Sequence, residues 1–275
     1  MGVVRGLTGA AGKRAPSGGS VERVDEDVSV RVFRPGSGPA PGLLWIHGGG
    51  YVIGSAAMAD PFCRGVARHL GGVAAAVEYR LAPEHPFPAP LEDCYAALRW
   101  LAAQPDVDAE RIVIGGESAG GGLAAALALL ARERGEVRPI LQVLSYPMLD
   151  DRTSERTDVD PRSLRLWSLN ANRFGWGAYL GAAGEVPPLA APARYEDLSG
   201  LPPAWIGVGT NDLFLDEDLA YAERLREAGV PCDVHTVEGA YHGFDLVERR
   251  AGVSREYVRA RIAAVREAFS GSSGG

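Results

Sequence analysis

Short apolar runs alternate along this chain with segments of helical periodicity, and this alternation restricts the fold more than any other feature. The runs typical of buried strands are residues 43–46, 73–77, 111–114, 140–144 and 204–208, with a weaker one at 233–237. Helical patterns lie between or after them at residues 61–70, 91–103, 119–134, 215–228 and 254–269. Strands that alternate with helices of this length form βαβ units, so we predict an α/β fold with a mostly parallel central sheet flanked by helices. Such a sheet places its ligand site at the carboxyl ends of its strands.

Two segments depart from this rhythm. Residues 28–33 alternate apolar and polar side chains, which predicts a half-buried edge strand. Residues 150–198 have no strand pattern and carry an aromatic series, Trp167, Phe174, Trp176 and Tyr179. We interpret this segment as a reduced helical cap inserted over the active edge of the sheet, because long insertions in compact domains tend to be functional. The alternative is a surface excursion with no role in the site.

The chain of 275 residues is then long enough for one large α/β core that carries an insertion. Residues 21–149 and 199–269 form this core, and the cap interrupts it. Residues 1–20 read as a flexible leader and residues 270–275 as a disordered tail, because both are rich in small polar residues and glycine.

Charge and cysteine content exclude several classes of partner. The net charge of −7 leaves no basic surplus for phosphates, which argues against nucleic acid. No apolar run is long enough for a signal peptide or a membrane-spanning helix. Cys63, Cys94 and Cys232 are odd in number and form no C-x-x-C pair, so each is expected to be a small buried hydrophobe. We therefore predict a cytoplasmic protein with no membrane partner.

Residues 116–120 (GESAG) fit the pattern G-x-S-x-G, placed between a buried strand and an alanine-rich helix. A sharp strand-to-helix turn presents the serine at the helix N-terminus, whose positive end favours developing negative charge. Residues 47–50 (HGGG) follow an earlier strand, 68 residues before Ser118 (118 − 50). Successive glycines let backbone N–H groups approach an oxyanion, although a flexible turn would have the same composition. Together the two motifs predict Ser118 as a nucleophile beside an oxyanion loop.

A serine hydroxyl needs an adjacent base, and the position of His242 suits it best among five histidines. His242 lies in the loop beyond the last predicted strand, at the end of the chain order Ser, Asp, His. Asp212 directly follows the strand at 204–208, so its carboxylate is expected at the same sheet edge, where it would orient the imidazole. Asp216 and Glu217 compete for this role, but they lie in the first turn of the next helix and suit its dipole.

With these residues in place, the chain resembles the hormone-sensitive lipase family of esterases, the bacterial family IV group, over about residues 28–269. The matching motifs are HGGGY (47–51), YRLAPEHPFPAP (79–90), GESAGG (116–121), DLFLDE (212–217) and HGF (242–244). The resemblance implies a serine carboxylesterase that hydrolyses short-chain acyl esters through an acyl-enzyme intermediate, with no metal or cofactor. It also implies an oxyanion hole formed by the N–H groups of Gly48, Gly49, Gly50 and Ala119.

The chain differs from that family at Glu117, where Asp or Thr is usual, and at its front, where members usually carry several dozen helical residues. The second difference predicts that the insertion covers the pocket alone. From this difference we expect a more open pocket. We also expect an exposed apolar surface, which a homodimer would cover. Two other functions stay open. One is a non-enzymatic ligand receptor, although receptors related to this family have lost the histidine. The other is a different acyl transfer, such as amide hydrolysis or deacetylation, which shares the triad chemistry.

Overall fold

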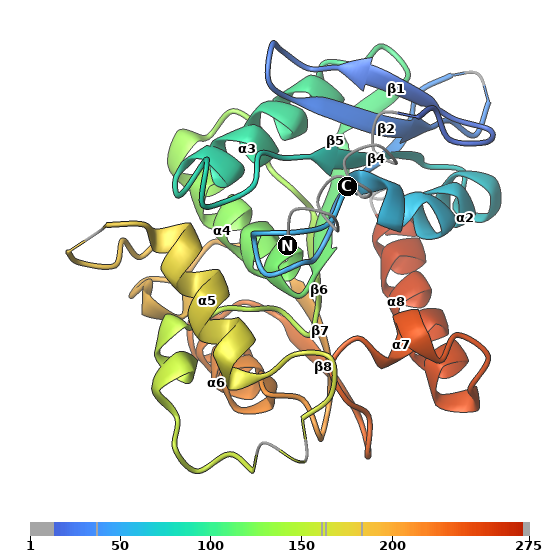
Figure 1. Cartoon of the computed structure of the whole chain (residues 1–275). Helices are drawn as coiled ribbons and strands as arrows, with labels where there is room; N and C mark the ends of the chain where they lie inside the picture. Colours follow the sequence, from blue (N-terminus) through green and yellow to red (C-terminus); the bar gives the residue numbers. More distant parts are fainter. Residues whose placement is uncertain (1–13, 37, 161, 163, 183, 272–275) are drawn as a thin grey trace.

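The computed structural model describes residues 14–36, 38–160, 162, 164–182 and 184–271 (Figure 1). In this described part the strands join one eight-stranded sheet in the order β1-β2-β4-β3-β5-β6-β7-β8. The strands are β1 (Ser20–Arg23), β2 (Ser29–Phe33), β3 (Ala40–Ile46), β4 (Val73–Glu78), β5 (Val107–Glu117), β6 (Leu141–Ser145), β7 (Ala204–Gly209) and β8 (Cys232–Val237). Strands β3 to β8 are mutually parallel, and β1 and β2 add antiparallel pairs at one side. The predicted α/β fold with a mostly parallel sheet is therefore confirmed.

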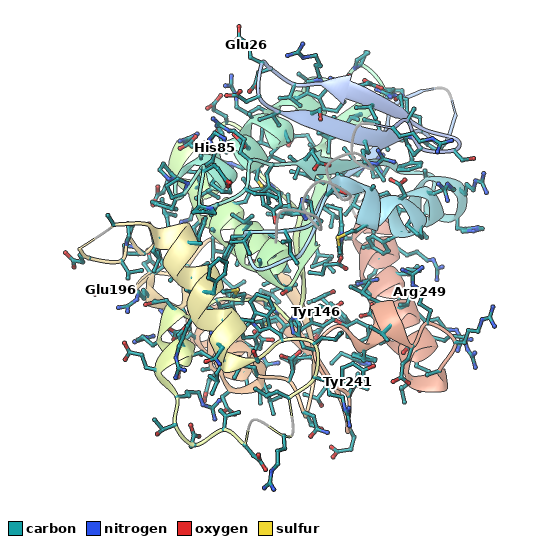
Figure 2. The ribbon with its side chains drawn as sticks, viewed as in Figure 1. Glu26, His85, Tyr146, Glu196, Tyr241 and Arg249 are labelled. Carbon is teal, nitrogen blue, oxygen red and sulfur yellow. The ribbon has the colours of Figure 1, made fainter. Side chains whose placement is uncertain are left out.

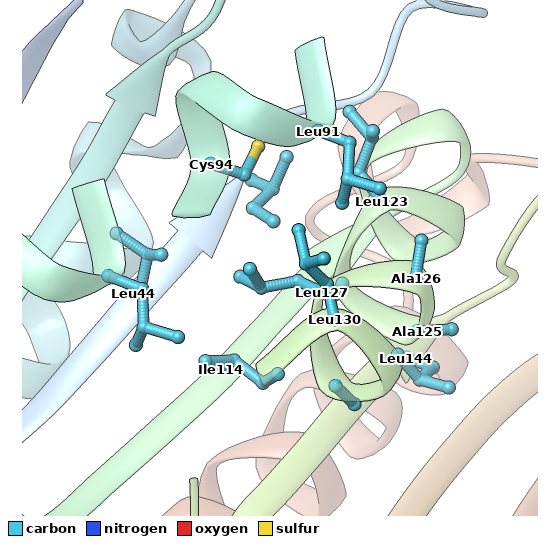
Figure 3. Packing of buried hydrophobic residues seen from close by; sticks show 14 of the residues in the cluster. Leu44, Leu91, Cys94, Ile114, Leu123, Ala125, Ala126, Leu127, Leu130 and Leu144 are labelled. Atoms are coloured by element: carbon cyan, nitrogen blue, oxygen red, sulfur yellow. The ribbon is translucent and has the colours of Figure 1, made fainter. Parts of the chain in front are cut away.

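Helices cover both faces of the sheet, so that residues 112–117 of β5 are buried on both sides. The longer helices are α2 (Asp60–Leu70), α3 (Ala89–Ala102), α4 (Ala119–Arg134), α5 (Leu169–Leu180), α6 (Leu215–Glu227) and α8 (Gly252–Ser270). Ile112 and Ile114 of β5 belong to the core shared with α3, α4 and α6, which Figure 3 shows around Ile114 and Leu127. Val113 faces the other core, which α2 and α8 complete. This alternation follows from the two-residue period of a strand.

Strand β2 is not an edge strand, which corrects the prediction made from its alternating pattern. It lies between β1 and β4, and Val30 and Val32 are fully buried. The polar position that suggested exposure is Arg31, which is 3% exposed. Its guanidinium donates to both carboxylate oxygens of Asp60 on α2, at 2.7 and 2.6 Å. An ion pair with a helix thus takes the place of solvent, which the local alternation could not reveal.

The true edge on this side is β1, which begins at Ser20 within the segment predicted as a leader. Its sequence SVER carries a single apolar residue, too little for a strand signal. Residues 1–13 of the predicted leader and 272–275 of the predicted tail lie outside the described residues. Ser270 is the last residue of α8. Among the described helices, none combines the length and the hydropathy that crossing a membrane requires.

In the residues described between 150 and 198, the inserted segment contains one α-helix, α5, and two 3-10 turns, η2 (Asp151–Glu155) and η3 (Pro192–Arg194). Tyr179 of α5 is fully buried and stacks on Tyr51, with 3.9 Å between ring centroids. Trp176 packs against the same Tyr51 ring at 5.4 Å. Because Tyr51 directly follows the glycine loop 48–50, these aromatic contacts hold α5 close to that loop (Figure 1).

Candidate active site

Ser118 lies on the turn between β5 and α4 in a strained backbone conformation. Its φ of 57° and ψ of −124° fall outside the regions that residues with a side chain normally adopt. The turn is possible because its neighbours have no side chain. A Cβ on Gly120 would lie 2.2 Å from the carbonyl oxygen of Ile46, and one on Gly116 would lie 2.3 Å from the carbonyl oxygen of Gly120. The Ser118 N–H donates to the Ser145 carbonyl at 2.9 Å, which fixes the turn on β6.

The three side chains predicted to act together lie in one hydrogen-bonded line. His242 Nε2 is 2.9 Å from Ser118 Oγ, and His242 Nδ1 is 2.8 Å from Asp212 Oδ2. The loop after β7 carries Asp212, and the loop after β8 carries His242. The second Asp212 oxygen accepts the N–H of Phe214 at 3.0 Å, and the Asp212 side chain is fully buried. The carboxylate is therefore held in one orientation, facing the imidazole.

Neither competing acid contacts the imidazole. Asp216 is exposed and forms an ion pair with Arg156 at 2.6 Å. Glu217 is buried, and its Oε1 accepts the N–H groups of Leu149 and Asp150 at 2.7 and 3.1 Å. The hydroxyl of Thr153 hydrogen bonds to its other oxygen. Glu217 therefore fastens the start of the inserted segment to α6, a role that its position in the sequence did not reveal.

The burial of Glu217 makes the stability of the protein depend on pH. Burial raises the pKa of the Glu217 carboxyl from 4.5 to about 8. Between these values the folded chain keeps a proton that the unfolded chain releases. The contribution of Glu217 to stability is therefore complete below pH 4.5 and is lost as the pH rises to about 8.

Glu217→Gln should remove this dependence, because glutamine keeps the shape and donors of the protonated acid. We expect the difference between the unfolding temperatures of the variant and of wild type to increase in favour of the variant as the pH is raised from about 5 to about 8. Scanning calorimetry at both pH values measures it, and the exposed Glu223→Gln on the same helix serves as control. Parallel profiles for Glu217→Gln and wild type would contradict the assignment.

The glycine loop approaches Ser118 so closely that side chains have no room. A Cβ on Gly48 would lie 3.2 Å from the Ser118 Cβ and 2.9 Å from the Glu117 carbonyl oxygen. Gly49 has a φ of +120°, and its carbonyl accepts the N–H groups of Val52 and Ile53. On the other side of Ser118, Ala119 is the first residue of α4, so its N–H has no acceptor within the helix. N–H donors of the loop and of Ala119 can thus converge on an oxygen beside Ser118.

His47 stabilises this loop. Its ring is fully buried and stacks on Tyr79, with 4.3 Å between centroids. His47 Nδ1 lies 2.7 Å from the Gly48 carbonyl oxygen, and the Tyr79 hydroxyl donates to the His47 carbonyl at 3.0 Å. Burial lowers the pKa of His47 to about 4, so the ring is neutral near pH 7. These contacts give His47 a structural role in the loop.

Trp167 and Tyr146 are two aromatic residues near His242 that lie outside the predicted motifs. A Cβ on Gly50 would lie 2.1 Å from the ring of Trp167, and this ring is 6.3 Å from the His242 ring, centroid to centroid. Asn172 accepts the Trp167 indole N–H at 3.1 Å, which fixes the ring. Tyr146, labelled in Figure 2, meets His242 edge-on at 4.9 Å. The sequence carries only weak indications of these roles: Trp167 belongs to the aromatic series of the insertion, and Tyr146 directly follows β6.

A mostly parallel sheet that joins a serine on a strand-to-helix turn to a histidine and an aspartate defines the α/β-hydrolase class. A family model described as the alpha/beta hydrolase fold matches residues 43–246, and the chain belongs to this family, among esterases similar to hormone-sensitive lipase.

Several named esterases are similar over most of the chain. Esterase LipI of Mycobacterium tuberculosis strain H37Rv is 37% identical over 227 residues, which cover 79% of this chain and 71% of LipI. Carboxylic ester hydrolase LipN of the same strain is 36% identical over 263 residues, covering 89% of this chain and 68% of LipN. A solved bacterial heroin esterase is 40% identical, with a TM-score of 0.87 over 98% of this chain and 90% of its own.

Proposed function

We propose that the protein is a serine carboxylesterase that hydrolyses short-chain acyl esters through an acyl-enzyme intermediate. The observation that carries this proposal is the hydrogen-bonded line from Asp212 through His242 to Ser118. Relatives that are 35–37% identical bear the names esterase, carboxylesterase and ethyl acetate hydrolase. A small ester is therefore the substrate. A cytoplasmic location and a homodimer stay predictions from the sequence.

The proposed reaction has two halves. In the first, Ser118 Oγ attacks the ester carbonyl carbon while His242 Nε2, 2.9 Å away, takes its proton. The N–H groups of Gly48, Gly49 and Ala119 stabilise the oxyanion, and His242 then passes the proton to the departing alcohol oxygen. In the second half, His242 takes a proton from water, whose oxygen attacks the acyl carbon. Collapse returns the proton to Ser118 and releases the carboxylic acid. Gly50 is the fourth predicted donor of the oxyanion hole.

We propose that the inserted segment acts as the cap and that Trp167 limits the size of the substrate. The Trp167 ring lies against Gly50 and near His242. It therefore covers the space between the glycine loop and the histidine, through which the ester carbonyl must reach Ser118. Trp167 is held by Asn172, which in turn donates to the Ser154 hydroxyl at 3.1 Å. A ring fixed in this way leaves little room for a long acyl chain.

The test is a series of p-nitrophenyl esters with acyl chains from about two to about sixteen carbons, compared by kcat/KM. We expect the short chains to give the highest values. A maximum at about twelve carbons or more would contradict the proposed size limit. Trp167→Ala should move the optimum to longer chains and raise the ratio of octanoate to acetate ester hydrolysis about tenfold. Phe174→Ala, at an exposed position of α5, is the control and should leave the optimum in place.

A further inference from the structure

A second cavity lies on the face of the sheet that α2 and α8 cover, between these helices and α7 (Phe244–Val247). Its volume is about 410 Å³, within the range of small-molecule pockets. Its walls include the aromatic rings of Trp45 and Phe62 and the aliphatic side chain of Ile262. Ser118, Asp212 and His242 are not among the described residues that line it. The cavity is therefore separate from the proposed active site.

The cavity is lined by buried polar groups that have no hydrogen-bond partner in the described part of the chain. These atoms are Glu117 Oε1, Asp245 Oδ2, Ser254 Oγ and Arg261 Nε, in residues that are 1–4% exposed; Asp245 Oδ2 also forms an ion pair with Arg261 Nη1 at 3.6 Å. Buried polar groups in folded proteins almost always have a hydrogen-bond partner. Ser254 Oγ and Arg261 Nε can donate to an oxygen of a bound molecule, whereas the two carboxylate oxygens need donors, which water can supply.

The charge around the cavity favours an anion. Arg249, Arg255 and Arg259 are exposed and line it, and among the described residues none of them has a carboxylate partner (Figure 2 labels Arg249). With Arg261 the lining holds four arginines against two carboxylates, Glu117 and Asp245, a balance of +2 (4 − 2).

The N-terminus of α8 adds to this charge. Ser254 and Arg255, in the first turns of the helix, line the cavity, and no side chain caps the helix at Ala251. The positive end of a helix and its first N–H groups attract an anion.

We propose that this cavity binds an amphipathic monocarboxylate, with its apolar body against Trp45 and Phe62 and its carboxylate at the α8 N-terminus and the arginines. This class of ligand comprises longer homologues of the short-chain acids that the proposed hydrolysis releases, so its biological meaning rests on the proposed function, although the binding site does not. Glu117 directly precedes Ser118, and Asp245 accepts the hydroxyl of Tyr146, whose ring meets His242. A bound acid therefore inhibits hydrolysis without competing with the ester.

Titration calorimetry with octanoate tests the site. The enzyme is first treated with diethyl p-nitrophenyl phosphate, and mass spectrometry shows whether Ser118 is modified. We expect the modified enzyme to bind octanoate at one site, and octanamide, its neutral analogue, at least about tenfold more weakly. If Ser118 does not react, the proposed function fails, and the titration of the untreated enzyme still tests the cavity.

Variants locate the bound acid. The double change Arg255→Gln with Arg259→Gln should weaken octanoate binding about tenfold, because two charge-assisted contacts are lost. Ile262→Trp should abolish binding by filling the cavity. Arg266→Gln, an exposed arginine of α8 that does not line the cavity, should bind like wild type. All of these variants should keep the wild-type kcat/KM without octanoate.

Three results would overturn the proposal. These are equal octanoate affinity in the double variant and in Arg266→Gln, equal affinity for octanamide, and loss of binding once Ser118 is modified. The last would place the acid in the active site. Inhibition by octanoate that is purely competitive with the ester would overturn the inferred link to catalysis.

Discussion

Ser118→Ala should lower kcat for p-nitrophenyl butyrate about 10⁶-fold, which leaves only the residual rate that binding and the oxyanion donors provide. Alanine removes the oxygen that lies 2.9 Å from His242 Nε2, so no acyl-enzyme can form. The measurement is initial-rate kinetics with enzyme whose unfolding midpoint has been shown to match wild type.

The control for this loss is Ser199→Ala, an exposed serine of the same core that should keep full activity. Undiminished hydrolysis by the Ser118→Ala variant would sink both the nucleophile assignment and the proposed mechanism. Alanine has to adopt the same strained backbone conformation as Ser118, so we expect the unfolding midpoint to stay close to that of wild type. With an unchanged midpoint, a loss of activity reports on the missing hydroxyl and not on a change of fold.

Asp212→Asn should lower kcat about 10⁴-fold while the fold stays intact. The asparagine amide can present an N–H to His242 Nδ1, which favours the tautomer that carries its proton on Nε2. That tautomer cannot accept the proton of Ser118, and the imidazolium also loses its facing carboxylate. Steady-state kinetics across the pH range measure the effect, and a partial recovery at high pH is consistent with hydroxide taking over the role of the base.

Asp216→Asn is the matched control, because the same substitution is made four residues further on at a competing acid. Asp216 pairs with Arg156 on the surface, where ion pairs contribute about 0–1 kcal/mol to stability, so activity should stay near wild type. The reverse pattern, in which Asp216→Asn loses activity and Asp212→Asn keeps it, would assign the acid to the other residue of the motif.

The fold could be predicted because its signals are local. A strand segment buried on both faces is mostly apolar, and β3, β4, β7 and residues 112–116 of β5 carry this mark in their own residues. The failures have physical causes too. Strand β1 has one apolar residue and depends on β2 for its hydrogen bonds, and β2 lies inside the sheet with its one charged side chain, Arg31, paired with Asp60 of a distant segment.

The candidate site was open to prediction for a related reason. In a parallel sheet the carboxyl ends of the strands meet at one edge, so loops after β3, β5, β7 and β8 are brought together wherever they lie in the sequence. Ser118, Asp212 and His242 each follow one of these strands. Trp167, Glu217 and Tyr146 could not be assigned in the same way, because their roles come from contacts between distant segments.

The sequence by itself determined the alternating sheet, the glycines that permit the turn at Ser118, and the chain order of the three side chains, because each depends on residues that are near neighbours. Only the tertiary structure decided that Asp212 rather than Asp216 faces His242, that Trp167 covers the glycine loop, and that buried polar atoms line a cavity beside α8. These outcomes depend on distances across the fold, and hydrogen bonding and packing act only between groups in contact. No pattern within one segment contains such a distance.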